Sequence, residues 1–200
     1  QVIYSIVYDE HKKPLFLIGK LINIQKQVEE RTLLEEQAEK DQLTGVYNRI
    51  GFYKMLDKSR IGQLKKGLSA LCIIDLDEFK HVNDTLGHAG GDELLVMLSH
   101  NLQKIFKNDA IISRFGGDEF MVYIKKIDTI EELHSKAKEL CSSMDTVLEY
   151  NNNTCKASIS MGVAIDHRNM SYEDLLDKAD KALYKAKNNG RNQYNIYEND

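Results

Sequence analysis

The stretch RFGGDEFMVYI, residues 114–124, constrains the fold more than any other part of the sequence. An apolar run stops at Gly116 and Gly117, and a second apolar run begins directly after an Asp–Glu pair. Short apolar runs on either side of a glycine turn predict an antiparallel hairpin of residues 110–115 and 119–125. The turn explains the glycines, but two adjacent carboxylates at a hairpin tip require either water or a bound cation.

Helical and strand-like patterns alternate along the sequence after residue 41. Some segments repeat apolar residues on one helical face, and others are uninterrupted apolar runs. The predicted helices are residues 48–58, 92–106, 130–148 and 172–188, and the predicted strands are residues 69–75, 110–115, 119–125, 156–165 and 193–198. Ser171 and Asp174 form a capping-box pattern at the start of the last helix, and Gly190 suits its end. This order predicts an α+β fold, an α/β sandwich in which helices flank a central, mainly antiparallel sheet.

The first 40 residues differ from the rest. Residues 2–8 and 15–24 predict two strands, which are marginal in water on their own, so we expect them to end a domain that begins outside this sequence. The sequence also begins without Met, which suggests an excised fragment. Residues 25–40 contain no Gly or Pro and predict a helix with i,i+4 ion pairs. We expect this helix to pair with a second copy of the chain; the alternative is a solvated linker helix.

The composition argues against some functions. The net charge of −4 gives no global reason to bind nucleic acid or an anionic membrane. No apolar run reaches the roughly 18 residues that span a bilayer, and the first residues lack the features of a signal peptide. Three cysteines, an odd number, suit reduced thiols. We therefore expect a cytoplasmic fragment without membrane contact, and leave open whether the full-length protein is membrane-attached.

A second unusual stretch is IIDLDEFKHVNDTLGHAGGDELL, residues 73–95. Asp75 ends an otherwise apolar strand, so its carboxylate is expected at the edge of the sheet. Asp77 would share a face with Asp75 if the strand continued, and only one of the two need be a ligand. The alternative for Asp75 is an N-cap of the following helix. An EF-hand is excluded because Phe79 follows the Asp-x-Asp pattern and the required glycine is absent.

Together the two stretches place a strand-end Asp beside the acidic hairpin tip. Converging carboxylates repel and raise one another's pKa, and a hard divalent cation relieves this. Mg²⁺ prefers one or two protein carboxylates and completes its shell with water and substrate phosphates, so the pattern predicts a nucleotide triphosphate. Lys80 can neutralise phosphate charge, as can Lys187 and Arg191, spaced four apart at a helix end. The alternative for the last two is compensation of the helix dipole.

Asn83 and Asp92 are candidate readers of a guanine base. The Watson–Crick edge of guanine offers two N–H donors beside an acceptor. A carboxylate accepts from both donors and an amide satisfies another edge, whereas adenine presents the wrong pattern to a carboxylate. Spacing alone does not bring the two residues to a base, and the alternative for Asp92 is a cap of the helix at 93–106.

The complete motif of Gly116, Gly117, Asp118, Glu119 and Phe120 resembles the signature of the GGDEF family of diguanylate cyclases. Three further blocks match: DQLTGVYNRIGF at 41–52, DLDEFKHVNDTLGHAGGDELL at 75–95 and ALYKAKNNGRNQY at 182–194. The resemblance implies a GGDEF domain at 41–200, with a fold similar to the adenylyl cyclase and polymerase palm. It also implies an enzyme that condenses two GTP into cyclic di-GMP and releases two pyrophosphates, with Mg²⁺ as cofactor and Mn²⁺ as the alternative ion.

The resemblance assigns a role to each matching residue. Asp75, Asp118, Glu119 and the carbonyl of Leu76 would bind the metal. Asp118 would also help to deprotonate the attacking 3′-hydroxyl, and Lys80 would stabilise the transition state, so that Asp118, Lys80 and Glu119 form the catalytic set. The GTP-binding residues would be Asn83 and Asp92 at guanine, Lys187 and Arg191 at the triphosphate, Gly116 and Gly117 at the turn, and His88. For His88 the alternative is packing at a helix end.

One family feature is missing. Many members carry an Arg-x-x-Asp motif that binds the product and inhibits the enzyme. Here those positions are Lys107, Asn108, Asp109 and Ala110. Lys107 lacks the planar fork of arginine, and Ala110 has no carboxylate. We therefore predict weak or absent product inhibition at this site.

The resemblance also implies an assembly. Each domain would hold one GTP, so catalysis requires a homodimer with the domains facing antiparallel. The helix at 25–40 resembles the signalling helix that precedes many such domains, and residues 1–24 resemble the end of a PAS-type sensor. Two alternatives remain: a catalytically silent module that binds GTP or responds to cyclic di-GMP, and a cyclase that makes mixed cyclic GMP–AMP. Asp75, Lys80 and Asp118 argue against the first, and Asp92 argues against the second.

Overall fold

The structure, a computed structural model of the 200-residue chain, describes every residue except 1, 27, 29–36, 61–67, 167–169 and 199–200. The chain divides into two compact units, Gln1–Ala38 and Glu39–Asp200. In the part of the chain that is described, no helix has both the length and the apolar character that crossing a bilayer requires.

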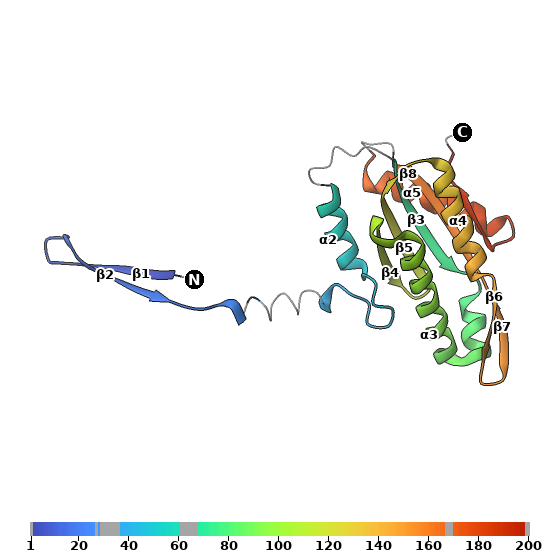
Figure 1. Ribbon diagram of the computed structural model, residues 1–200, viewed down its shortest axis with the longest axis horizontal. Helices are drawn as coiled ribbons and strands as arrows, with labels where there is room; N and C mark the ends of the chain where they lie inside the picture. Colours follow the sequence, from blue (N-terminus) through green and yellow to red (C-terminus); the bar gives the residue numbers. More distant parts are fainter. Residues whose placement is uncertain (1, 27, 29–36, 61–67, 167–169, 199–200) are drawn as a thin grey trace. The chain divides into compact units, whose positions relative to one another are not determined.

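A five-stranded sheet forms the centre of the larger unit, in the order β4-β5-β3-β8-β9 (Figure 1). Its strands are β3 (Leu68–Leu76), β4 (Ala110–Gly116), β5 (Glu119–Ile127), β8 (Ile159–Asp166) and β9 (Gln193–Ile196). All neighbouring pairs are antiparallel except β8 and β9, which are parallel. The predicted α+β fold with a mainly antiparallel sheet is therefore confirmed.

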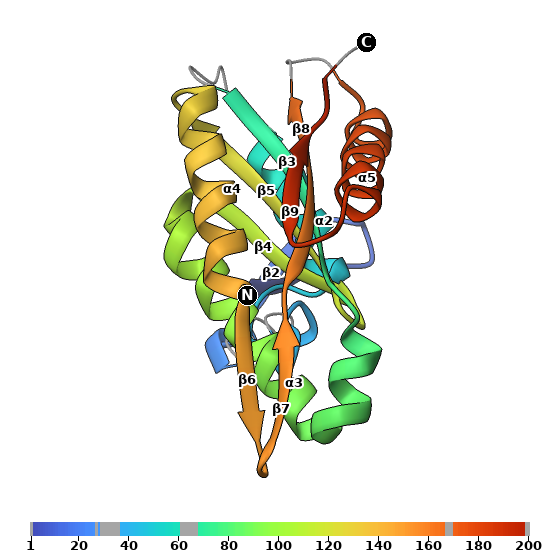
Figure 2. The same ribbon diagram turned by 90° about the vertical axis from the view of Figure 1, so that its right-hand side faces the viewer.

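Helices cover both faces of this sheet (Figure 2). They are α2 (Arg49–Arg60), α3 (Phe79–Phe106), α4 (Ile130–Met144) and α5 (Tyr172–Asn188). Ala70, Cys72 and Ile74 of β3 pack with the apolar residues of α3 and α4. Leu71 and Ile73 point the other way and pack with those of α2 and α5. The central strand is buried on both faces, which explains why it reads as an unbroken apolar run.

Two helix starts follow the chemistry expected from the sequence. The Ser171 side chain accepts a hydrogen bond from the Asp174 backbone N–H at 3.0 Å, which begins α5 as the capping-box pattern predicts. Thr129 begins α4 in the same way, with the N–H of Glu132 at 3.1 Å. Each bond satisfies an N–H group that would otherwise lack a partner within the helix.

The prediction of one helix over residues 130–148 is wrong at its end. The helix stops at Met144, and residues Thr146–Tyr150 form β6, paired with β7 (Asn153–Ala157). Asn151 and Asn152 have φ of 49° and 64°, which makes a two-residue hairpin turn that asparagine tolerates. The apolar helical stripe ran past this turn signal. The prediction of one strand over residues 156–165 is also wrong at its start, because β7 ends at Ala157 and β8 begins only after Ser158.

The prediction of a helix over residues 92–106 is too short. The helix α3 begins at Phe79 and is broken at Gly87, whose φ of 76° and ψ of 167° are not helical. Glycine permits this conformation because it has no side chain. The break folds the first turns of α3 away from the long segment that follows, and this matters for the site.

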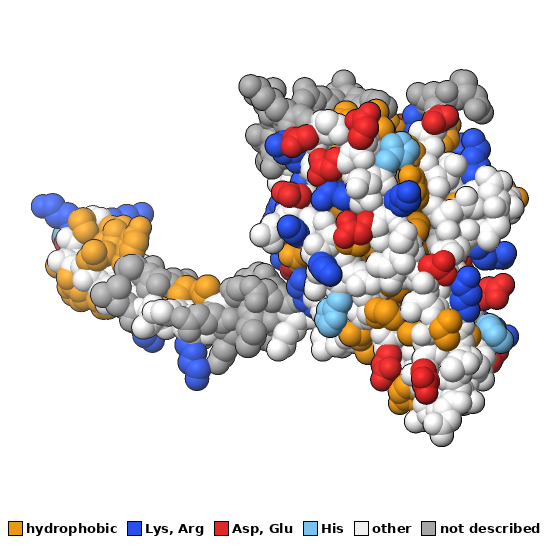
Figure 3. Space-filling model, turned by 45° about the vertical axis from the view of Figure 1, so that its right-hand side comes forward, with side chains coloured by type: hydrophobic (Ala, Val, Ile, Leu, Met, Phe, Trp, Pro, Cys, Tyr) orange, Lys and Arg blue, Asp and Glu red, His pale blue; other side chains and the backbone are white. Residues whose placement is uncertain are grey.

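The smaller unit is a hairpin of β1 (Val2–Tyr8) and β2 (Pro14–Leu21), close to the predicted strands. Its side chains at Tyr4, Leu15 and Leu17 are more than half exposed, and Figure 3 shows apolar groups gathered on its surface. The predicted helix at 25–40 lies largely outside the described residues. The PAS-type interpretation, the pairing of that helix and the cytoplasmic location stay predictions.

Candidate active site

An open pocket of about 310 Å³ lies where β3 ends. It gathers residues from β3, the start of α3, the β4–β5 hairpin and the end of α5. The residues that line it are Asp75, Leu76, Asp77, Glu78, Phe79, Lys80, Asp118, Lys187 and Arg191. Of the residues predicted to form the site, the fold brings six together here: Asp75, Leu76, Lys80, Asp118, Lys187 and Arg191.

Asp75 is largely buried, with 14% of its side chain exposed. The Lys187 Nζ lies 2.7 Å from its Oδ1. Burial is the main cause that raises the pKa of Asp75, the Asp118 charge raises it further, and Lys187 opposes the shift. The N-cap alternative for Asp75 is wrong, because Glu78 occupies the N-cap of α3, with φ of 54° and no side-chain cap. Lys187 lies in the last turn of α5, as the dipole alternative requires, and its ammonium group also pairs with the Asp75 carboxylate.

The hairpin tip sits directly beside this strand end. In the register of β3 and β5, Asp75 pairs with Glu119, and the Leu76 N–H donates to the Asp118 carbonyl at 3.4 Å. Gly117 has φ of 56°, a region that L side chains rarely adopt. A Cβ at Gly116 or Gly117 would meet no atom within 4 Å. Within the chain, glycine is therefore required at this turn for its backbone conformation and not for lack of space.

Arg114, Gly117 and Asp41 form a hydrogen-bonded brace behind the hairpin turn, which the sequence did not predict. Arg114 donates from Nε and Nη2 to the Gly117 carbonyl at 2.9 and 2.8 Å, and from Nη1 to Asp41 Oδ1 at 3.3 Å. Asp41 also accepts from Thr44 N–H and Oγ1 at 2.9 and 2.6 Å. Although burial opposes ionisation, the bonds from Thr44 and the Arg114 guanidinium lower the pKa of Asp41. The brace fixes the turn that carries Asp118, and its only sequence signal was the block at 41–52.

The other predicted residues lie outside the residues that line this pocket. On α3, a Cβ at Gly91 would lie 2.0 Å from Asn83 Oδ1, so the Asn83 side chain rests against Gly91. The break at Gly87 makes this approach between two parts of α3 possible. Asp92 follows Gly91, is exposed and lies inside the helix, so the cap alternative for Asp92 is wrong. His88, directly after the break, and Glu119, at the hairpin, are also exposed.

The donor set suits a hard cation with few protein ligands. Within the described ranges, no group of three or more His, Cys, Asp and Glu side chains could hold a metal ion. Four acidic residues line the pocket, and the predicted ligands among them are Asp75 and Asp118, beside the Leu76 residue whose carbonyl was predicted as a ligand. Mg²⁺ is commonly held by one or two carboxylates plus substrate phosphates, so these residues fit that ion better than zinc or calcium.

Comparison with known proteins gives a consistent result. The family described as "Diguanylate cyclase, GGDEF domain" matches residues 38–193. The chain is 33% identical over 175 residues to diguanylate cyclase DgcM and 37% identical over 173 residues to the probable diguanylate cyclase DgcC, both of Escherichia coli strain K12. Each match covers 86% of this chain, but only 41% of DgcM and 46% of DgcC. The chain therefore spans less than half the length of these relatives.

A solved structure supports the fold. The coiled coil and GGDEF domain of DgcB from Caulobacter crescentus, in complex with c-di-GMP, matches with a TM-score of 0.78. The match covers 86% of this chain and 93% of that one, at 23% sequence identity. At this identity the likeness concerns the fold of the domain.

Proposed function

The chain belongs to the GGDEF family, and on that premise we propose that it is a diguanylate cyclase. In this reaction the 3′-oxygen of one GTP attacks the α-phosphorus of a second GTP. The bond from that phosphorus to the β-phosphate oxygen breaks, and pyrophosphate leaves. Two such steps close cyclic di-GMP. The observation that carries the proposal is the convergence of Asp75, Asp118 and the cations Lys80, Lys187 and Arg191 on one pocket.

The acidic residues of this pocket would act on the metal and on a proton. Asp75, Asp118, Glu119 and the Leu76 carbonyl would hold Mg²⁺ or Mn²⁺, which supplies positive charge for the phosphates and lowers the pKa of a bound hydroxyl. Asp118 would accept the 3′-hydroxyl proton. Its backbone is fixed by the hairpin turn, so the carboxylate needs little reorganisation.

The basic residues would neutralise charge on the triphosphate. The Lys187 ammonium group pairs with the Asp75 carboxylate in the structure. A metal ion bound at Asp75 would displace Lys187, whose ammonium group would then be available to the phosphates. Arg191 can add bidentate hydrogen bonds to a phosphate. Lys80 lies on the first turn of α3 and would stabilise the charge that develops on the pyrophosphate leaving group.

Asn83 and Asp92 would select guanine. The contact of Asn83 with Gly91 places its amide next to the residue that precedes Asp92. An amide and a carboxylate so placed can accept from the guanine N–H groups and donate to its O6. Gly116, Gly117 and His88 complete the predicted GTP-binding set.

Two domains are needed because each pocket would hold one GTP. A homodimer with antiparallel domains would bring each 3′-hydroxyl to the α-phosphate of the other substrate. The helix predicted at 25–40 would set how often the two domains meet. We further propose that product inhibition at residues 107–110 is weak or absent, because Lys107 and Ala110 do not supply the arginine fork and the carboxylate.

A nucleotide assay tests this proposal. The protein would be incubated at several concentrations with GTP and Mg²⁺, with ATP and a GTP/ATP mixture in parallel, and products separated by chromatography. We expect cyclic di-GMP from GTP alone, rising more than linearly with protein concentration. If no product forms even when the chain is fused to a dimerising coiled coil, the chain is a silent module.

A further inference from the structure

Asp77 directly follows β3 and makes contacts that neither the proposed metal site nor the proposed base readers explain. It is only 7% exposed. Its Oδ1 accepts a hydrogen bond from Ser160 Oγ at 2.6 Å. Its Oδ2 accepts from Ser158 Oγ at 2.6 Å and from the backbone N–H of Asn192 at 3.0 Å. The carboxylate is therefore fully engaged in joining the end of β3 to β8 and to a segment more than a hundred residues later.

That segment, residues 190–192, connects α5 to β9 and has an unusual backbone. Gly190, Arg191 and Asn192 have φ of 111°, 62° and 49°. Residues with a side chain rarely adopt positive φ, and such conformations persist only where surrounding contacts hold them. The Arg191 N–H donates to the Ala186 carbonyl at 3.2 Å. The bond from Asn192 to Asp77 ties the same turn to the strand end.

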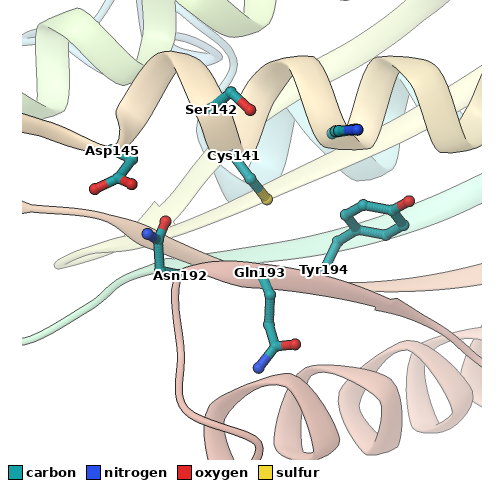
Figure 4. Close-up of a pocket in the computed structure, with 7 residues that line it drawn as sticks. Cys141, Ser142, Asp145, Asn192, Gln193 and Tyr194 are labelled. Carbon is teal, nitrogen blue, oxygen red and sulfur yellow. The ribbon is translucent and has the colours of Figure 1, made fainter.

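The connection also separates two pockets. Arg191 lines the pocket at the end of β3. Asn192 lines a second cavity of about 390 Å³ between α4 and β9, where its side chain faces Asp145 (Figure 4). A hydrogen bond from Asn192, followed by one from Lys156, lowers the pKa of Asp145. Asn192 is thus held by a carboxylate on each side, through its backbone by Asp77 and through its side chain by Asp145.

We propose that Asp77 is a positioning residue that holds the connection at residues 190–192, and so aims Arg191 at the triphosphate of a bound nucleotide. This inference rests on the proposed function, since Arg191 must meet phosphate. The end of β3 would thus contribute to the site in two ways. Asp75 lies in the pocket itself, and the buried Asp77 holds the segment after α5 that carries Arg191. The effect of Asp77 on the nucleotide then passes through Arg191.

A double-mutant cycle tests this directly. Binding of guanosine 5′-(α,β-methylene)triphosphate with Mg²⁺ would be measured by calorimetry for the wild type, Asp77→Ala, Arg191→Ala and the double variant. We expect Arg191→Ala and Asp77→Ala each to weaken binding about tenfold, and Asp77→Ala to add less than twofold once Arg191 is gone. The matched control is Ser160→Ala, which removes one bond to Asp77 but keeps its bond to Asn192, and should change binding less than twofold. Equal losses from Asp77→Ala in both backgrounds would overturn the proposal.

Two further measurements keep the test decisive. If Asp77→Ala does not fold, Asp77→Asn takes its place in the cycle, with an expected loss of about threefold in the wild-type background and none without Arg191. Amide hydrogen exchange of the free protein needs no nucleotide. In Asp77→Asn the Asn192 amide, which donates to Asp77, should exchange at least about fivefold faster, and an unchanged rate would contradict the proposal. A wild-type protein that binds no GTP analogue would instead contradict the proposed function, and the exchange rates would still decide the role of Asp77.

Discussion

The candidate site has a phosphate end, with Asp75, Asp118 and Lys187, and a base end, with Asn83 and Asp92. The two ends are built in different ways. The phosphate end combines β3, the β4–β5 hairpin and α5, and its closest pair, Asp75 and Lys187, is 2.7 Å apart in space but far apart in sequence. The base end lies within the single helix α3, where the break at Gly87 and the small Gly91 let Asn83 approach. The groups proposed to act on phosphate thus depend on the whole fold, whereas the proposed base readers depend on one local feature. We expect the first set to control rate and the second to control nucleotide choice.

The largest expected effect is at the phosphate end. Asp118→Ala should lower cyclic di-GMP formation at least about a thousandfold, because it removes a proposed metal ligand and the proposed proton acceptor together. Product formation would be followed by chromatography, and folding by the thermal unfolding midpoint. Asp180→Ala, an exposed acidic residue on α5, is the matched control and should keep full activity. Near wild-type turnover by Asp118→Ala would show that this end does not set the rate.

The base end is tested by closing the space beside Asn83. Gly91→Ala would ordinarily stabilise a helix by about 1 kcal/mol, but here the new Cβ would overlap Asn83 Oδ1. We expect the free energy of unfolding to fall by about 1 kcal/mol and the preference for GTP over ATP to fall about tenfold. Adding Asn83→Ala should recover the stability but not the preference. A stabilised Gly91→Ala with unchanged preference would contradict the proposed base end.

The brace behind the hairpin should affect kcat without affecting the choice between GTP and ATP. Arg114→Lys keeps the charge but cannot bind the Gly117 carbonyl and Asp41 together. We expect kcat to fall about fivefold, with the ratio of GTP to ATP use unchanged. Lys125→Arg, a change on the neighbouring strand β5, serves as the control. A changed nucleotide ratio in Arg114→Lys would mean that the two ends are not separable.

The smallest effect concerns stability. Because burial raises the pKa of Asp75 in the folded state, ionisation of this group disfavours folding. Its contribution is fully present below the unfolded pKa and is lost as the pH rises through the folded pKa. Asp75→Asn should therefore raise the unfolding midpoint by a few degrees at neutral pH, while abolishing activity, and the gain should vanish in acid. A lower midpoint at neutral pH would show that the pair with Lys187 outweighs the burial.

The sequence predicted those features of the fold and of the candidate site that depend on residues close together in the chain. The glycine turn, the apolar strand that carries Asp75 near its end and the Ser171 cap each follow from a few neighbouring residues. The helix at 130–148 was extended too far because its apolar stripe masked the Asn151–Asn152 turn. The pairing of Asp75 with Lys187, the brace of Arg114 and Asp41 and the bond from Asn192 to Asp77 join distant segments. No periodicity in a single sequence specifies such partners, so they required the fold.

The most direct test of the central claim compares GTP with inosine triphosphate, which lacks the 2-amino group of guanine. The ratio of kcat/KM for the two nucleotides would be measured for the wild type, Asp92→Asn and Lys187→Ala. We expect the wild type to prefer GTP at least about tenfold. Asp92→Asn should lose most of this preference, whereas Lys187→Ala should keep it while kcat/KM for both nucleotides falls about tenfold or more. If Lys187→Ala changes the ratio as much as Asp92→Asn does, the division between a phosphate end and a base end is wrong.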